Sequence, residues 1–465
     1  MDWAIAIGLL IQATALVVLF GRLGRSWLTH AGAVFIVLAV AYHGLNEVLL
    51  WMFPNQDSYR FILQPSDIDA FIIWISFAIL FLTVVYVFAL GSAIAPKTAP
   101  TDVIRRVFDW RLMGLFAAPL LALTIAGNGF NVSAGLTADT TPIGTAAGLA
   151  SQFLLLSLVL ASFGFVVRFG QGWLLPVLVV QSTAVALIGQ RLEILICAIL
   201  LLYALALIGM KLRRRQLVFG FTAFAVVGLV VTSARAAQGH QFVSTASSGD
   251  LRLDYLAAGV TNLGSPSFWN ELSFDAGHRL DGNSFGAFEL VSLDLGYPPL
   301  GAAPLVNDFL STVPSFINPV KVYAPLAMRS DKEYAEVYLR IPLPYVAPGL
   351  HEDILPTQLG GTMGLWGPWG MLLIAVVLGI GFGRADRWLL KQRTPSRLVI
   401  GLGLMLCVLY YERSWNEYPF TFRGIAVMLV IVWILQHLTA NKPQRVDPII
   451  ARLADEVRLR KQPQT

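Results

Sequence analysis

Three polar side chains near the start of the chain share the spacing of one helix face. His43, Asn46 and Glu47 lie at positions i, i+3 and i+4 within an otherwise apolar segment, 30–53. An ionisable group inside a membrane is costly unless it is paired, so such residues face a bundle interior and mark candidate functional sites. Two interpretations agree with this pattern. The face handles protons or lines a substrate path, or it joins helices through interhelical hydrogen bonds.

Three arginines lie at the ends of apolar segments, at the depth of lipid head groups. Arg191 begins one segment, two residues before Glu193. Arg413 follows a later segment, and Arg423 opens the last one. A guanidinium binds a diphosphate through bidentate, charge-assisted hydrogen bonds, which predicts an anion-binding role. For Arg191 the alternative is an interfacial ion pair with Glu193. Interfacial anchoring explains the aromatic residues around Arg413, but it does not explain the arginines.

A long polar segment, 235–361, supplies the remaining candidates. Its basic candidates are Arg279, Lys321 and Arg340. His351 and Glu352 lie just before the next apolar segment, where they would overhang a site at membrane level. An unperturbed histidine can act as a base near neutral pH. The alternative for His351 is a solvated loop histidine without a role.

No metal and no cofactor is predicted. The sequence contains no Gly-x-x-x-x-Gly-Lys-Ser/Thr phosphate loop, no His-Glu-x-x-His pair and no Cys/His cluster. ATP hydrolysis and metalloprotease chemistry are therefore disfavoured. The candidates instead indicate a site lined by cations at lipid depth, which suits a substrate with a lipid tail, a diphosphate linker and a polar head.

The elements that must position these residues are membrane-spanning helices. Of the 465 residues, 56% are hydrophobic and 13% are charged, against roughly 25% charged in a soluble domain. The net charge of +5 does not indicate a nucleic-acid partner, because the charges lie in short clusters between apolar segments. A span needs roughly 20 apolar residues. The candidate spans are 3–20, 30–53, 69–94, 112–127, 145–167, 172–189, 192–210, 217–234, 362–383, 398–411 and 421–438.

The distribution of Lys and Arg predicts the topology. The odd-numbered loops and the C-terminal tail are basic, whereas the even-numbered short loops are poor in Lys and Arg. The positive-inside rule then places the N-terminus outside and the C-terminus in the cytoplasm. The sequence thus predicts an all-α polytopic membrane protein with about eleven transmembrane helices and one large loop outside the cytoplasm. The predicted domains are 1–234 with helices one to eight, 235–361 as the large loop, 362–440 with helices nine to eleven, and 441–465 as a basic cytoplasmic tail.

Four motifs together resemble the O-antigen and exopolysaccharide polymerases of the Wzy type, or oligosaccharide repeat-unit polymerases. Ile188–Arg191 is similar to the family's Gly-x-Arg junction, and Phe309–Lys321 to its Ile-Pro … Pro-x-Lys loop segment. Leu359–Gly370 is similar to the glycine-rich start of a late span, and Arg423-Gly424 to the Arg-Gly that opens the last helix. The resemblance covers roughly 185–435. Many members have an acidic residue where this chain has Gly360-Gly361.

The resemblance implies a membrane glycosyltransferase of the GT-C class in the bacterial inner membrane, with its large loop in the periplasm. Such enzymes use undecaprenyl-diphosphate-linked oligosaccharides and need no metal or nucleotide sugar. The growing chain moves from its carrier lipid to a new repeat unit with inversion of the anomeric centre. Arg191, Arg413 and Arg423 would bind the diphosphate and stabilise the charge that develops on the leaving group. The implied partners are these substrates, membrane lipid and a chain-length regulator protein.

The resemblance also implies roles for the large loop. Lys321 and Arg340 would steer the second lipid-linked substrate, with Arg279 as a further binding residue. His351 or Glu352 would deprotonate the acceptor hydroxyl.

Three other functions remain open from the sequence. An O-antigen ligase has the same fold and donor but transfers the polymer to a lipid A core. A transporter or lipid flippase would line its pathway with the polar face of the second span, although such proteins often show internal repeats and broken helices. The third alternative is a structural or scaffolding role.

Overall fold

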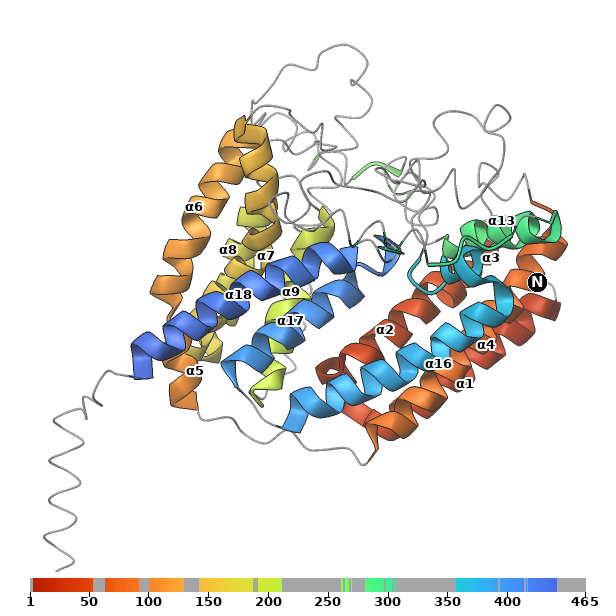
Figure 1. Ribbon diagram of the computed structural model, residues 1–465, viewed down its shortest axis with the longest axis horizontal. Helices are drawn as coiled ribbons and strands as arrows, with labels where there is room; N and C mark the ends of the chain where they lie inside the picture. The colour runs from red at the N-terminus through yellow and green to blue at the C-terminus, as the bar shows by residue number, and fades with distance from the viewer. Residues whose placement is uncertain are drawn as a thin grey trace, which may run out of the picture.

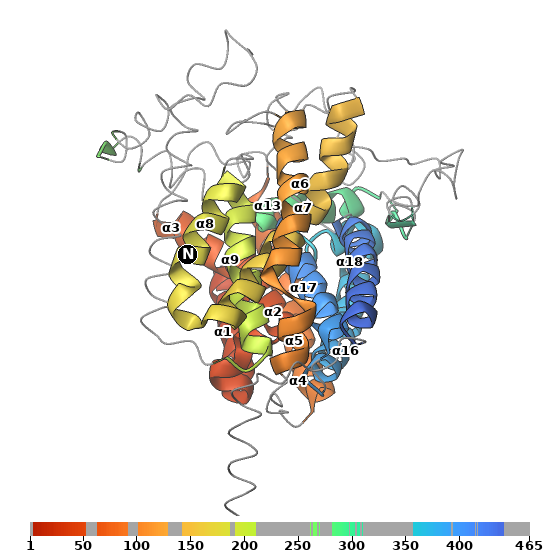
Figure 2. The same ribbon diagram turned by 90° about the vertical axis from the view of Figure 1, so that its left-hand side faces the viewer.

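The computed structural model describes mainly the helical parts of the chain. Within the described residues every regular element is a helix, and the helices pack side by side (Figures 1 and 2). The described ranges are 3–52, 63–91, 101–128, 142–186, 191–210, 281–296, 298–302, 357–391, 394–413 and 417–440, with isolated positions at 261, 264–266, 269, 305–306, 309 and 415.

One group of helices, the first bundle, gathers around α4 and combines both ends of the sequence. Its members are α1 (Trp3–Leu23), α2 (Ala31–Val40), α4 (Pro65–Leu90) and α16 (Thr362–Lys391). Gly379 and Gly383 lie one turn apart on α16 and let its backbone meet that of α4. A Cβ on Gly379 would lie 2.8 Å from the Leu82 carbonyl oxygen, and one on Gly383 would lie 2.9 Å from the Leu90 nitrogen. Small residues at this spacing permit such close helix contacts in membranes.

The other group, the second bundle, is built mostly from the middle of the chain. Its α6 and α7 pack along each other, and its α9 packs against α7, α8 and α17. Because α17 also contacts α2, it joins the two bundles. The members are α5 (Thr101–Val107), α6 (Trp110–Asn128), α7 (Pro142–Phe169), α8 (Leu174–Ala186), α9 (Arg191–Leu207), α17 (Pro395–Leu409) and α18 (Glu417–Ala440).

Several of these helices have the length and apolarity of membrane spans. Five described helices qualify on both grounds, and five apolar helices of 10–17 described residues accompany them. These ten overlap ten of the predicted spans, while the predicted span 217–234 lies outside the described residues. An all-helical protein with membrane-spanning character agrees with the sequence prediction. The number of eleven crossings stays a prediction.

The predicted second span is not a continuous α-helix. After α2, a π-helical turn, η2 (Ala41–Leu45), leads into α3 (Asn46–Met52). A π-turn inserts an extra residue into the helical repeat and is frequent at functional sites. His43 lies within this turn, and Asn46 and Glu47 begin the helix after it.

The helix ends that carry the described basic residues of the loops gather at one end of the molecule, towards the bottom of Figure 1. Arg22, at the end of α1, donates a hydrogen bond of 2.6 Å to the carbonyl of Gly91, at the end of α4. The basic end is defined by Arg22, Arg105, Arg106, Arg168, Arg387, Lys391 and Arg397. α3 and the first turn of α16 lie at the opposite end.

The predicted large loop contributes one long described helix, α13 (Gly282–Asp294), which packs against α4, α16 and η2. The residues after it are tied to the first turn of α16. α16 is kinked just after that turn, at Gly367, whose φ is +72°, and Pro368 follows. Pro368 has no N–H for the Gly364 carbonyl, and the backbone N–H of Leu300 donates to that carbonyl instead, at 3.1 Å.

Candidate functional site

A buried hydrogen-bond network joins the second span to two segments of the predicted loop. We call it the polar network, with His43, Asn46, Glu47, Asp281, Asn283 and Thr357 as its members, and the end of the molecule that holds it the network end. His43 lies at its centre and is fully buried. Its Nδ1 lies 2.7 Å from the Asn283 Oδ1, and its Nε2 lies 3.1 Å from the Thr357 Oγ1.

These distances fix the tautomer of His43. The amide nitrogen of Asn283 donates to the His43 carbonyl at 3.0 Å and to a Glu47 oxygen at 2.6 Å, so the Asn283 Oδ1 is the acceptor. His43 therefore carries its proton on Nδ1, and its Nε2 accepts from the Thr357 hydroxyl. Both ring nitrogens are satisfied by protein groups. In this arrangement the polar face of the second span connects helices through hydrogen bonds. This favours a structural role for the face over a role in proton transfer.

Asp281 extends the network at the start of α13. Its carboxylate accepts from the Asn46 amide at 3.2 Å, and from the backbone N–H and the hydroxyl of Ser284 at 3.1 and 2.5 Å. The bond to the Ser284 N–H makes Asp281 the N-cap of α13. A single aspartate thus starts the helix and binds that helix to the second span.

Two glycines allow the network to close. A Cβ on Gly282 would lie 2.6 Å from the Thr357 Cγ2 and 3.0 Å from the His43 Cε1. A Cβ on Gly360 would lie 2.5 Å from the Thr357 Oγ1. A larger residue at either position would separate the groups that His43 joins.

The network end continues into the last helices through Gln358. Its amide nitrogen donates to the carbonyls of Cys407 and Tyr410 at 2.7 and 3.1 Å, and its amide oxygen accepts from the Tyr418 hydroxyl at 2.9 Å. One turn further along α18 lies Arg423, which is half-buried. The segment 357–361 is therefore held between the second span on one side and α17 and α18 on the other.

The predicted diphosphate-binding arginines lie at or near helix ends. Arg423 is in the second turn of α18, Arg191 is the first residue of α9, and Arg413 is the last residue of the short helix η6 (Tyr411–Arg413). α9 runs from the network end to the basic end, and α18 starts at the network end (Figure 1). Glu412, the neighbour of Arg413, accepts from the Tyr42 hydroxyl of η2 at 2.9 Å, so all three positions lie at the network end.

The other predicted site residues lie outside the described part of the chain. They are Arg279, Lys321, Arg340, His351 and Glu352. Their roles stay predictions from the sequence.

The sequence did not indicate Asp281, Asn283 or Thr357. A local signal for α13 was present, because no proline lies between Pro266 and Pro298 and Asp281 precedes Ser284 at capping distance. No local signal could reveal their partners, since more than 230 residues separate each of them from the second span.

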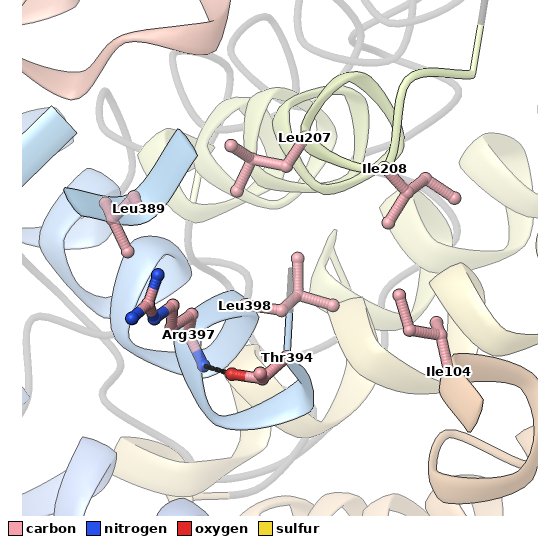
Figure 3. Close-up of a pocket in the computed structure, with 7 residues that line it drawn as sticks. All are labelled: Ile104, Leu207, Ile208, Leu389, Thr394, Arg397 and Leu398. Carbon is pink, nitrogen blue, oxygen red and sulfur yellow. Dashed lines mark hydrogen bonds between the residues drawn. The ribbon is translucent and has the colours of Figure 1, made fainter. Parts of the chain in front are cut away.

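A small pocket lies at the basic end, between the ends of α9 and α17 (Figure 3). It offers about 10 Å³, which is room for on the order of one water molecule. The guanidinium of Arg397 donates to the Trp388 carbonyl at 2.9 Å and stacks over the Trp388 ring. This pocket is therefore too small for a substrate. Its lining residues are Ile104, Leu207, Ile208, Leu389, Thr394, Arg397 and Leu398.

Within the described residues no group of three or more His, Cys, Asp or Glu side chains has an arrangement that could hold a metal ion. Comparison with known proteins gives no match to a family model, a curated protein or a solved structure.

Proposed function

We propose that this chain is a membrane glycosyltransferase that polymerises oligosaccharide repeat units carried on undecaprenyl diphosphate. In this proposal the network end faces the periplasm and the basic end faces the cytoplasm, as the positive-inside rule requires. The protein would reside in the bacterial inner membrane, with its N-terminus in the periplasm and its C-terminus in the cytoplasm.

The observation that carries the proposal is the position of three arginines away from the basic end. Arg191, Arg413 and Arg423 belong to three different helices that meet the same end of the bundle. Arginine at the outer ends of spans runs against the topological preference, so a binding partner must favour it there. A lipid-linked diphosphate is such a partner, because it brings two phosphates to head-group depth and binds guanidinium groups bidentately.

The proposed reaction is a displacement at the anomeric carbon of the donor. An acceptor hydroxyl attacks this carbon, the bond from the carbon to the diphosphate oxygen breaks, and undecaprenyl diphosphate leaves. The three arginines stabilise the negative charge that grows on the leaving diphosphate. The acceptor proton passes to a base, for which His351 and Glu352 are the proposed residues.

The test replaces Arg423, the one of the three arginines whose side-chain environment is described. In cells that depend on this chain for polymer, Arg423→Ala is expected to lower polymer yield by at least about a hundredfold, the cost of removing one charge-stabilising donor. Arg423→Lys retains charge but loses bidentate binding, so an intermediate yield is expected. Arg384→Ala, an exposed position on α16, is the control. Normal polymer from Arg423→Ala, at wild-type amounts in the membrane, would overturn the proposal.

The residual products separate a polymerase from a ligase. Loss of polymerisation leaves single repeat units on the carrier lipid or the cell surface. Loss of ligation leaves long polymer on the carrier lipid. The Arg423→Ala cells therefore identify the reaction as well as the residue.

One observation favours a transporter as the second candidate. The second span is interrupted by a π-turn that carries His43, and interrupted spans form the binding sites of many transporters. However, the side chains at this interruption are closed over by α13 and by Thr357. Uptake of a lipid-linked sugar into liposomes, without formation of a glycosidic product, would favour the transporter.

A further inference from the structure

Glu289 is a buried carboxyl group that the proposed function does not use. It lies on α13, its side chain is fully buried, and among the described residues neither of its oxygens accepts a hydrogen bond of normal geometry. Apolar residues flank it on the helix, including Phe288 and Leu290. A buried carboxylate without a partner is far less stable than the protonated acid. In this position Glu289 therefore holds its proton.

The surrounding charges reinforce this conclusion. Besides the phenols of Tyr42 and Tyr86, the titratable groups on α13, at its N-cap and on the neighbouring η2, α3 and α4 are His43, Glu47, Asp67, Asp69, Asp281 and Asp294. All but His43 are acidic, and His43 is bound as a neutral ring to Asn283 and Thr357. α16 carries no charged residue before Arg384, which is about 20 residues, or roughly 30 Å of helix, beyond Gly364. Burial raises the pKa of Glu289 well above its ordinary range, and the Gly364 backbone N–H opposes this only in part.

Glu289 shares the docked face of α13 with two glycines. Gly282, Gly286 and Glu289 follow the spacing i, i+4 and i+7, which places them on one side of the helix. Gly282 packs on Thr357 and His43, and Gly286 packs on the ring of Phe71. The carboxyl group is thus inside the interface between α13 and the first bundle. A negative charge at Glu289 can be hydrated only if α13 moves away from this position.

We propose that α13 is a lid on the network end and that its docked position requires a proton on Glu289. When the lid lifts, the side chains of His43, Asn46 and Glu47 lose their partners on α13 and become available to water or to a polar ligand. Low pH keeps the lid closed, and high pH opens it.

The direction follows from linkage. Below pH 4.5, the ordinary pKa of a glutamate carboxyl, Glu289 carries its proton in both the docked and the lifted form. Docking of α13 is then at full strength. Above that value the lifted form releases the proton first. Each further pH unit then weakens docking by about tenfold, until Glu289 ionises in the docked form as well.

The test measures hydrogen–deuterium exchange of the full-length protein in lipid nanodiscs at about pH 6 and about pH 9, a range that spans the values known for buried glutamates. After correction for the intrinsic exchange chemistry, the amides of α13 are expected to exchange at least about tenfold faster at the higher pH. Amides of α4 serve as the internal reference and should not change. In Glu289→Gln, a neutral mimic of the acid, α13 should show no dependence on pH.

A matched control lies on the same helix. Asp294 is exposed, so Asp294→Asn should retain the wild-type response. The proposal is overturned if wild-type α13 shows no dependence on pH, if α4 changes as much as α13, or if Glu289→Gln keeps the wild-type response. The wild-type curve decides the matter by itself if Glu289→Gln does not reach the membrane.

Discussion

The two ends of the second span each hold a buried polar cluster, and the clusters join different parts of the molecule. At the basic end, Asp386 of α16 accepts hydrogen bonds from the backbone N–H groups of Ala31 and Gly32 and from the Tyr86 hydroxyl, at 2.9, 3.0 and 2.9 Å. These donors belong to α2 and α4. A carboxylate at a helix N-terminus satisfies free N–H groups and interacts favourably with the helix dipole.

At the network end, the partners of the second span lie outside the spans. Asp281 and Asn283 belong to the start of α13, and Thr357 precedes α16. The chemistry is similar at the two ends, since both clusters bury polar groups and satisfy them with protein partners. The difference is in the elements that each cluster joins. The Asp386 cluster joins spans to each other, whereas the polar network joins the second span to α13 and to the residues before α16. Damage to the first should destabilise the whole bundle, and damage to the second should release α13 alone.

The strongest test of this contrast is Asp386→Ala. It leaves two backbone N–H groups and the Tyr86 hydroxyl buried without an acceptor, at a cost of about 3 kcal/mol or more in the free energy of unfolding. Thermal unfolding in detergent should show one early transition for the whole protein. Asp386→Asn retains one acceptor oxygen and should be less severe. If Asp386→Ala unfolds at the same temperature as the wild type, the Asp386 cluster does not hold the spans together.

Asn283→Ala should have the next largest effect, and a local one. It removes the acceptor of the His43 Nδ1–H and a donor to Glu47, which should weaken docking of α13 by about 2 kcal/mol. Hydrogen exchange in α13 should accelerate, while the thermal transition of the bundle stays close to that of the wild type. A large drop in the global transition with unchanged exchange in α13 would contradict the contrast between the two ends.

Tyr418→Phe should have the smallest effect. It removes one hydrogen bond to the Gln358 amide oxygen, at a cost of about 1 kcal/mol, while Gln358 keeps its two bonds to the carbonyls of Cys407 and Tyr410. Gln358→Ala, which loses all three bonds, is the comparison and should be more destabilising. If the two variants lower the unfolding temperature equally, the two bonds from Gln358 to the carbonyls of Cys407 and Tyr410 contribute nothing to stability.

Hydropathy predicted the helices because residues in contact with lipid must be apolar whatever their partners are. It predicted helix ends less well. The predicted span 362–383 stops before Arg384, whereas α16 continues to Lys391. Its continuation is explained by Asp386, a charged residue that is buried because it caps α2. The π-turn in the second span also escapes a hydropathy pattern, because it replaces one helical form with another in the same apolar segment.

Only the part of the candidate site that belongs to the second span could be predicted from the sequence. The spacing of His43, Asn46 and Glu47 predicts a shared interior face, and the structure buries all three. Their partners come from segments that are remote in the chain, and no pattern within the second span indicates them. Glu289 was missed for another reason. A glutamate within a polar, proline-rich segment is expected on a surface, and only the packing of α13 shows that it is buried.

The hydrogen bond between Leu300 and Gly364 has a consequence for biosynthesis. The start of the ninth predicted span lacks one α-helical hydrogen bond, because Pro368 has no N–H to donate to the Gly364 carbonyl. Leu300 precedes Gly364 in the chain, so the ribosome makes the donor before the acceptor. The missing bond is thus supplied by a part of the protein that has already been translated when α16 enters the membrane.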